Sequence, residues 1–172
     1  MKKITFDLDI HSYQIDRNGQ VHNAVYVNWM EVGRLKMLDT IGLPVSTLLT
    51  QGSYPALAQT TISYKTPLFS TDRVWIEMWI SALGYSSTIM QFQFFNAVSN
   101  SENVRDRVMA AEGYQRSMFV DKDSWKTKRF TRGEKDAFLP YLDVAPMENI
   151  DLLPKSPRMR VAASKSIHRS KV

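Results

Sequence analysis

Cysteine is absent from this 172-residue chain, and histidine occurs only three times. A chain without thiols forms no disulfide, no thiolate metal site and no thiol nucleophile, and it fits a reducing compartment. The histidines, at positions 11, 22 and 168, do not have the spacing of metal ligands. The sequence also contains no P-loop and no dinucleotide-binding glycine motif. We therefore expect neither a metal ion nor a cofactor.

Long apolar runs are missing as well. No segment reaches the about 18 consecutive apolar residues of a membrane-spanning helix. The first residues include Asp7 and Asp9, where a signal peptide needs an apolar stretch. We expect a cytoplasmic protein without a membrane span.

Positive charge is in excess, but only at the C-terminal end. The formal net charge is +5. Residues 155–172 contain six of the 22 Lys and Arg residues and no acidic residue, which leaves 16 basic against 17 acidic residues in the rest of the chain. This basic segment has no aromatic side chain on which a nucleic-acid base could stack. We therefore expect a flexible basic tail and no nucleic-acid partner.

The remaining sequence has enough apolar residues for one packed domain, since the chain is 44% hydrophobic and 11% aromatic. Ile4, Phe6 and Leu8 alternate with polar residues, which predicts a strand that continues to about residue 13. Helical periodicity follows over residues 23–41 and ends at a glycine. Similar patterns predict two shorter helices, over residues 45–51 and 132–141, and four further strands, over residues 54–66, 73–83, 87–98 and 107–121.

The long helical segment over residues 23–41 is apolar over most of its circumference, so we expect other structure to wrap it on all sides. Short turns separate the last three strands, which predicts an antiparallel meander. The expected fold class is therefore α+β, with one long central helix wrapped by a five-stranded curved antiparallel sheet. Three large aromatic side chains fall on the outward side of that sheet and favour association with a second copy: Trp75, Trp79 and Phe95.

One segment carries most of the functional information, namely Asp16-Arg-Asn-Gly19-Gln-Val-His22-Asn23-Ala-Val-Tyr26. It resembles the opening motif of the hotdog-fold thioesterases of the 4-hydroxybenzoyl-CoA thioesterase type. In that family an aspartate, a glycine three residues later and an Asn-Ala-x-Tyr helix start recur. The resemblance covers about residues 3–130 and implies a hotdog domain over residues 1–130. We expect the rest of the chain to form an extension packed on this domain, over 131–154, and the basic tail, over 155–172.

The same resemblance implies catalytic roles for residues of the motif. Asp16 is the carboxylate that activates water or attacks the thioester, and the backbone N–H of Asn23 stabilises the oxyanion. Gly19 lets the chain turn closely enough to bring both to one carbonyl. Independently of the resemblance, the unpaired amides at a helix start carry a partial positive charge that suits an oxyanion. His22 is either a second acid or base, or a residue that hydrogen-bonds the loop.

Four further residues are candidate substrate contacts. Tyr26 and Trp29 line an acyl pocket or belong to the core. Lys65 and Arg73 are candidates to bind the phosphates of coenzyme A, although both also fit ordinary surface charges. Some members of the family carry basic residues for this purpose in the turn that corresponds to residues 84–87. That turn contains no basic residue here, so the phosphates need other partners.

The resemblance implies hydrolysis of an acyl-CoA thioester to free acid and thiol, by a homodimer or homotetramer with its active site at the subunit interface. Hydrolysis of a thioester on an acyl carrier protein would use the same site. A hypothesis of another class is a non-catalytic module that binds an acyl group or recruits an acidic partner through the tail. That module would hydrolyse no thioester and would lose its partner when residues 155–172 are deleted.

Overall fold

The computed structural model describes residues 2–96 and 107–143. Its helices are α1 (Asn23–Thr40), α2 (Val45–Thr50) and α3 (Arg132–Phe138). Single turns of 3-10 helix are η1 (Ser12–Gln14) and η3 (Leu139–Tyr141). The strands are β1 (Ile4–Asp9), β2 (Ser53–Tyr64), β3 (Arg73–Leu83), β4 (Ser87–Asn96) and β5 (Val108–Asp121).

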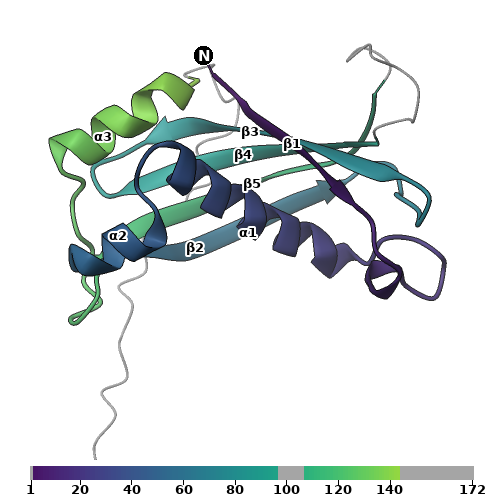
Figure 1. Cartoon of the computed structure of the whole chain (residues 1–172), viewed down its shortest axis with the longest axis horizontal. Helices are drawn as coiled ribbons and strands as arrows, with labels where there is room; N and C mark the ends of the chain where they lie inside the picture. Colours follow the sequence, from purple (N-terminus) through teal and green to yellow (C-terminus); the bar gives the residue numbers. More distant parts are fainter. Residues whose placement is uncertain (1, 97–106, 144–172) are drawn as a thin grey trace, which may run out of the picture.

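The five strands form one antiparallel sheet in the order β1-β3-β4-β5-β2. The predicted meander of the last three strands is confirmed, since β3 pairs with β4 and β4 pairs with β5. The 12-residue β2 forms one edge of the sheet, and the six-residue β1 forms the other. Figure 1 shows the twisted sheet with α1 lying across one of its faces.

The first strand is shorter than the sequence predicts, because it ends at Asp9 instead of continuing to about Tyr13. A local turn replaces its last residues. The Gln14 side chain accepts a hydrogen bond from the His11 N–H at 2.9 Å, and the Gln14 N–H donates to the His11 carbonyl at 2.9 Å. Tyr13 points into solvent with 81% of its surface exposed and stacks on the His11 ring. These local hydrogen bonds compete with continued strand pairing.

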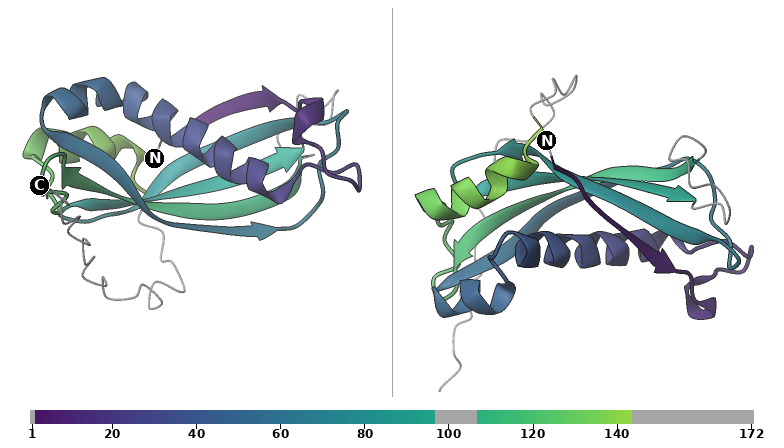
Figure 2. Two further views of the ribbon diagram at one scale, coloured as in Figure 1. Left: turned by 90° about the horizontal axis from the view of Figure 1, so that it is seen from below. Right: turned by 45° about the horizontal axis from the view of Figure 1, so that its top comes forward.

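Helix α1 packs on the sheet through one side, as the two views of Figure 2 show. Gly33 makes a close approach, since a methyl group there would lie 2.8 Å from a ring carbon of Phe92 and 3.1 Å from the sulfur of Met78. Another side of the helix is open, with Val27 37% and Leu35 38% exposed. The sequence predicts a helix covered on all sides, and the structure differs because a single sheet reaches only one side of it.

The outward face of the sheet is not the bare aromatic surface that the sequence predicts. The Lys3 Nζ lies 4.6 Å from the centre of the Trp79 ring, and the Arg107 guanidinium lies 4.0 Å from the centre of the Trp75 ring. Glu77 lies between the two cations, 2.8 Å from Lys3 and 3.9 Å from Arg107. Cations are attracted to the faces of aromatic rings, and their long stems cover apolar surface. Much of the expected apolar area is therefore already covered within one chain.

The segment after β5 packs against the end of the sheet where β3 finishes (Figure 1). Phe138 in α3 is fully buried and contacts the ring of Phe130. The Asp143 N–H donates to a carbonyl of β3 at 2.7 Å. The rest of the predicted extension, 144–154, and the predicted tail, 155–172, lie outside the described residues. In the described part of the chain, no helix has both the length and the apolar character needed to cross a membrane.

Gly113 in β5 offers a test of the pairing between β5 and β2. A Cβ at this position would lie 2.2 Å from the Thr61 carbonyl oxygen, so an alanine forces the two strands apart. We expect Gly113→Ala to lower the free energy of unfolding by about 2 kcal/mol, measured by urea denaturation. Gly133→Ala in α3 is the matched control, because nothing lies within 4 Å of its Cβ. Equal stability of the two variants would contradict the strand register.

Candidate active site

A small hairpin over residues 14–22 connects η1 to the start of α1. The His22 N–H donates to the Gln14 carbonyl at 2.8 Å, and the Asp16 N–H donates to the Gln20 carbonyl at 2.7 Å. The tip of the hairpin turns at Gly19, whose φ of 78° lies in the left-handed region that favours glycine. The hairpin thus places Asp16 opposite a residue only three positions before the helix.

The Asp16 side chain is held by its own turn. Its Oδ1 accepts hydrogen bonds from the Asn18 N–H at 2.8 Å and from the Gln20 N–H at 3.2 Å. No donor from the described residues reaches the other oxygen, Oδ2. The residue is half-buried. One oxygen therefore fixes the orientation of the carboxylate, and the second remains available to a ligand or a water molecule.

The loop before β3 fastens this hairpin to the sheet. The Val21 N–H donates to the Leu68 carbonyl at 2.8 Å, and Gln20 forms an isolated antiparallel bridge with Phe69. Asp72 holds the loop in turn, because its Oδ2 accepts from the Phe69 N–H at 2.8 Å. The start of α1 is therefore tied to the beginning of β3 as well as to the end of β1.

His22 is the N-cap residue of α1. Its Nδ1 accepts a hydrogen bond from the Ala24 N–H at 3.1 Å, and its carbonyl accepts from the Val25 N–H at 2.9 Å. Accepting at Nδ1 leaves the imidazole proton on Nε2. The Asn23 N–H donates to no atom of the described residues. Of the first three amides of the helix, this one alone is open to a ligand in the described structure.

Tyr64, at the end of β2, also contacts the start of α1 and is not among the residues that the sequence predicts there. Its hydroxyl donates to the Asn23 carbonyl at 3.0 Å, which holds the first turn of α1 against the edge strand. Its ring meets the Tyr26 ring edge to face, with centroids 5.3 Å apart. No signal in the sequence predicts this pairing with the helix start.

Tyr26 and Trp29 belong to the core, each with 3% of its surface exposed. Their rings lie 5.1 Å apart, and both contact Phe94 of β4. Burial, followed by the neighbouring Tyr64 and Asp72, raises the pKa of Tyr26 to about 12. The Tyr26 hydroxyl therefore stays protonated near neutral pH and cannot act as a base.

The two predicted phosphate contacts lie in ion pairs at opposite edges of the sheet. Lys65 Nζ is 3.0 Å from a carboxylate oxygen of Glu112. Arg73 pairs with Asp7 and with Asp9, the latter at 3.2 Å. Lys65 follows Tyr64 and so lies near the helix start, whereas Arg73 is paired with β1. Both cations are partly neutralised within the chain.

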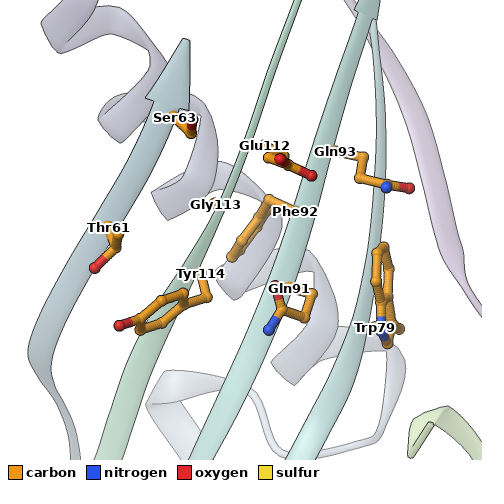
Figure 3. A pocket seen from close by; sticks show the side chains of 9 residues that line it. All are labelled: Thr61, Ser63, Trp79, Gln91, Phe92, Gln93, Glu112, Gly113 and Tyr114. Carbon is orange, nitrogen blue, oxygen red and sulfur yellow. The ribbon is translucent and has the colours of Figure 1, made fainter. Parts of the chain in front are cut away.

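A cavity of about 260 Å³ lies on the outward face of the sheet (Figure 3). Strands β2, β3, β4 and β5 all contribute to its lining, which consists of Thr61, Ser63, Trp79, Gln91, Phe92, Gln93, Glu112, Gly113 and Tyr114. None of the predicted site residues lines it. Among the described residues, no group of three or more acidic or histidine side chains is arranged to hold a metal ion.

The predicted residues thus separate into two groups. The hairpin and the first helical turn contain four of them, Asp16, Gly19, His22 and Asn23. A carboxylate with one free oxygen can activate water, and an unpaired helix amide can stabilise an oxyanion. The other four residues, Tyr26, Trp29, Lys65 and Arg73, pack or form ion pairs within the chain.

The whole fold is similar to that of solved thioesterases. DHNA-CoA thioesterase from Staphylococcus aureus aligns with a TM-score of 0.71 at 17% identity, over 81% of this chain and 91% of that chain. A likeness at this level of identity shows the fold alone. The five-stranded antiparallel sheet is accordingly that of the hotdog fold that the sequence predicts.

Two related proteins are similar in sequence. The putative acyl-CoA thioesterase YneP of Bacillus subtilis (strain 168) is 24% identical over 135 residues, which are 78% of this chain and 92% of that protein. The chloroplastic acyl-acyl carrier protein thioesterase ATL3 of Arabidopsis thaliana is 32% identical over 89 residues, which are 52% of this chain and 46% of that protein. The model of the thioesterase-like superfamily matches residues 10–148, well over half of the chain. This chain is a member of the thioesterase-like superfamily.

Proposed function

We propose that the chain is an acyl-CoA thioesterase in which Asp16 is the general base and the Asn23 amide is the oxyanion donor. The hairpin over residues 14–22 carries this proposal, because it leads from a fixed carboxylate directly into an open helix start. Gln20, which lies opposite Asp16, is three residues before Asn23, and three residues of extended chain span about 10 Å. A thioester carbonyl and its attacking water fit between groups at this separation.

The reaction balances with these groups and one water molecule. The Oδ2 of Asp16 takes a proton from water while the water oxygen bonds to the thioester carbon. The carbonyl electron pair moves to oxygen, where the Asn23 N–H and the partial positive charge of the helix start stabilise it. The carbonyl then re-forms, the carbon–sulfur bond breaks, and the leaving thiolate takes the proton from Asp16. The products are a free acid and a thiol.

The carrier of the acyl group is the point on which the two relatives differ. The Bacillus subtilis protein, which aligns over most of this chain, is named as a putative acyl-CoA thioesterase. The Arabidopsis thaliana protein, which aligns over about half of this chain, is named as an acyl-acyl carrier protein thioesterase. Because the Bacillus subtilis protein aligns over the larger share of this chain, coenzyme A is the favoured carrier. Thioesters of acyl carrier protein are the second candidate, and relative turnover of the same acyl group on the two carriers distinguishes them.

The proposed functional unit contains at least two copies joined along β2, as a homodimer or as the dimers of a homotetramer. A long edge strand presents unpaired backbone groups that template pairing with another strand, and β2 is twice as long as β1. Next to this edge lie the exposed apolar residues of α1 and β2, with Val27 at 37%, Leu35 at 38% and Leu57 at 39%. A second copy would cover these side chains.

Asp16→Asn tests the proposed base. The amide oxygen of Asn can still accept from the backbone of the turn, so the hairpin persists while the base is removed. We expect kcat for an acyl-CoA to fall by about 100-fold or more, with thermal stability close to that of wild type. Asp39→Asn, at the exposed C-terminal end of α1, is the matched control. Unchanged turnover in Asp16→Asn would overturn the assignment.

His22 is proposed to position the helix start and not to transfer protons. His22→Ala removes the cap and should lower the free energy of unfolding by about 1 kcal/mol, with a corresponding loss of activity. His22→Asn supplies another capping oxygen and should restore both stability and turnover. Stability from thermal denaturation and kcat from thiol release are the two measurements. A His22→Asn variant that is stable but inactive would show that the imidazole itself takes part in the chemistry.

The assembly is tested by charge on the edge strand. Leu57→Lys places a cation on the exposed edge of β2, and the two-fold repeat would bring two such cations together. We expect this variant to elute as a monomer of 19.8 kDa in size-exclusion chromatography with light scattering. Thr5→Lys, on the exposed face of β1, should leave the assembly intact. Dissociation by Thr5→Lys but not by Leu57→Lys would show that the subunits meet at β1, which would contradict the proposed assembly.

A further inference from the structure

The hydroxyl of Tyr64 forms a hydrogen bond at the first residue of α1. Tyr64 is the last residue of β2, and its hydroxyl donates to the Asn23 carbonyl at 3.0 Å. The side chain is 46% exposed. A hydrogen bond in such a place adds little to global stability, because water replaces it when the chain unfolds. Its main consequence is local, at the residue whose amide is the proposed oxyanion donor.

The sheet anchors the main chain of Tyr64. Tyr64 pairs with Ala111 of β5. Directly after it, the Lys65 N–H and the Thr66 N–H both donate to the Ala110 carbonyl, at 2.9 and 3.1 Å. The end of the strand is therefore fixed, and with it the point from which the tyrosine side chain extends.

The ring of Tyr64 is held by aromatic side chains of the core. It meets the Tyr26 ring edge to face, with 5.3 Å between the centroids, a geometry that aromatic pairs favour. Tyr26 is 3% exposed, and its ring in turn lies 5.4 Å from the Phe94 ring and 5.1 Å from the Trp29 ring. The half-exposed ring of Tyr64 is thus packed on one side against a buried cluster that belongs to α1 and β4.

Tyr64 therefore contacts α1 at two points about one helical turn apart. Its ring packs on Tyr26 and its hydroxyl bonds to Asn23, three positions earlier, and residues three apart lie on the same face of a helix. On the other side of the Asn23 amide lies His22, whose side chain caps the helix. The Asn23 N–H is thus placed between two anchored groups.

We propose that Tyr64 is a positioning residue, which aims the Asn23 N–H at the oxyanion of the thioester by holding the carbonyl of the same residue. The inference rests on the proposed function, because Tyr64 would act through the proposed oxyanion donor. Such a donor is effective when it is already fixed in the geometry of the transition state. A helix start has few restraints of its own, since its first N–H groups have no partner within the helix. Tyr64 supplies a restraint from the edge strand.

Tyr64→Phe removes the hydroxyl and keeps the ring on Tyr26. We expect kcat for an acyl-CoA to fall by about 10-fold, a part of the loss of about 100-fold or more that follows removal of an oxyanion donor. KM should stay within about 2-fold of wild type, because the donor acts on charge that develops in the transition state. Thiol release is measured well below the unfolding temperature, so that a small loss of stability leaves the folded fraction unchanged. Wild-type kcat in this variant would overturn the proposal.

Tyr54→Phe is the matched control, because it removes a tyrosine hydroxyl from the other end of the same strand. Tyr54 is 39% exposed, its ring lies 5.3 Å from the Trp125 ring, and its hydroxyl bonds to no described residue. This variant should keep the wild-type kcat and KM. An equal fall of kcat in Tyr54→Phe and Tyr64→Phe would contradict a role that depends on the contact with Asn23.

A proline at position 23 tests whether Tyr64 acts through the amide. Asn23→Pro removes the N–H, and proline suits the first position of a helix. His22 has φ −61° and ψ 135°, the extended conformation that the residue before a proline adopts. Asn23→Pro should lower kcat by about 100-fold or more, and adding Tyr64→Phe should then change kcat by less than about 2-fold. A further fall of about 10-fold in the double variant would show that Tyr64 acts by another route, against the proposal.

Hydrogen exchange followed by NMR measures the restraint itself. The Ala24 and Val25 N–H groups bond to His22, so their exchange rates report how often the first turn opens. Tyr64→Phe should speed their exchange by about 5-fold, while the amide of Met37, near the other end of α1, keeps its wild-type rate. A fall of kcat without faster exchange would mean that Tyr64 contacts the substrate directly, and the positioning role would be rejected.

The remaining outcomes separate this inference from the proposed function. If wild type hydrolyses acyl-CoA, Asn23→Pro is impaired and Tyr64→Phe is not, the inference fails while the thioesterase assignment stands. If Asn23→Pro keeps the wild-type kcat, the proposed oxyanion donor is wrong, and the role of Tyr64 fails with it. If wild type hydrolyses no thioester, the proposed function fails, and hydrogen exchange alone decides the restraint. Faster exchange in Tyr64→Phe then supports it, and unchanged exchange overturns it.

Discussion

The backbone pairing of residues 14–16 with residues 20–22 determines where the groups of the candidate site lie. Two hydrogen bonds of 2.7 and 2.8 Å close this hairpin, and a third of 2.8 Å, from Val21 to Leu68, fastens it to the loop before β3. Because α1 begins directly after the hairpin, the same bonds set the position of the first helical turn. The relation between Asp16 and the Asn23 amide is therefore fixed by main-chain geometry, which suits a site that must hold a reactive carbonyl.

The edge strand β2 makes a different aromatic contact at each of its ends. At one end of β2, Tyr64 holds the start of α1. At the other end, the Tyr54 ring packs against the ring of Trp125. The strand between them is a long sheet edge, and the open side of α1 lies above it. A two-fold pairing of this edge would bury the exposed apolar residues of α1 and β2.

Most of the secondary structure could be predicted because it depends on local patterns. Alternating apolar residues in β1, β3 and β4 give the strands and their buried faces, and helical periodicity gives α1 to within one residue of its end. The end of β1 was missed, since hydrogen bonds between His11 and Gln14 replace strand pairing there. The motif over residues 16–26 coincides with a hairpin and a helix start, which are local features that residue spacing reflects.

Contacts between distant segments could not be predicted in the same way. Lys3 and Arg107 cover outward tryptophans from β1 and from the start of β5, and nothing in either local sequence indicates this. The same holds for the ion pairs of Lys65 and Arg73, and for the hydroxyl of Tyr64, whose partner is 41 residues away. In each case the packing of the sheet determines which distant residue the side chain contacts. Charge or aromatic character alone therefore does not predict which contact such a side chain makes.

The most direct measurement is a crystal structure of the full chain with an acyl-CoA analogue in which a methylene group replaces the thioester sulfur. We expect the analogue's carbonyl oxygen about 2.7–3.1 Å from the Asn23 amide nitrogen, with Asp16 Oδ2 hydrogen-bonded to a water molecule beside the carbonyl carbon. A carbonyl bound elsewhere, such as in the outward cavity at Trp79 and Tyr114, would contradict it.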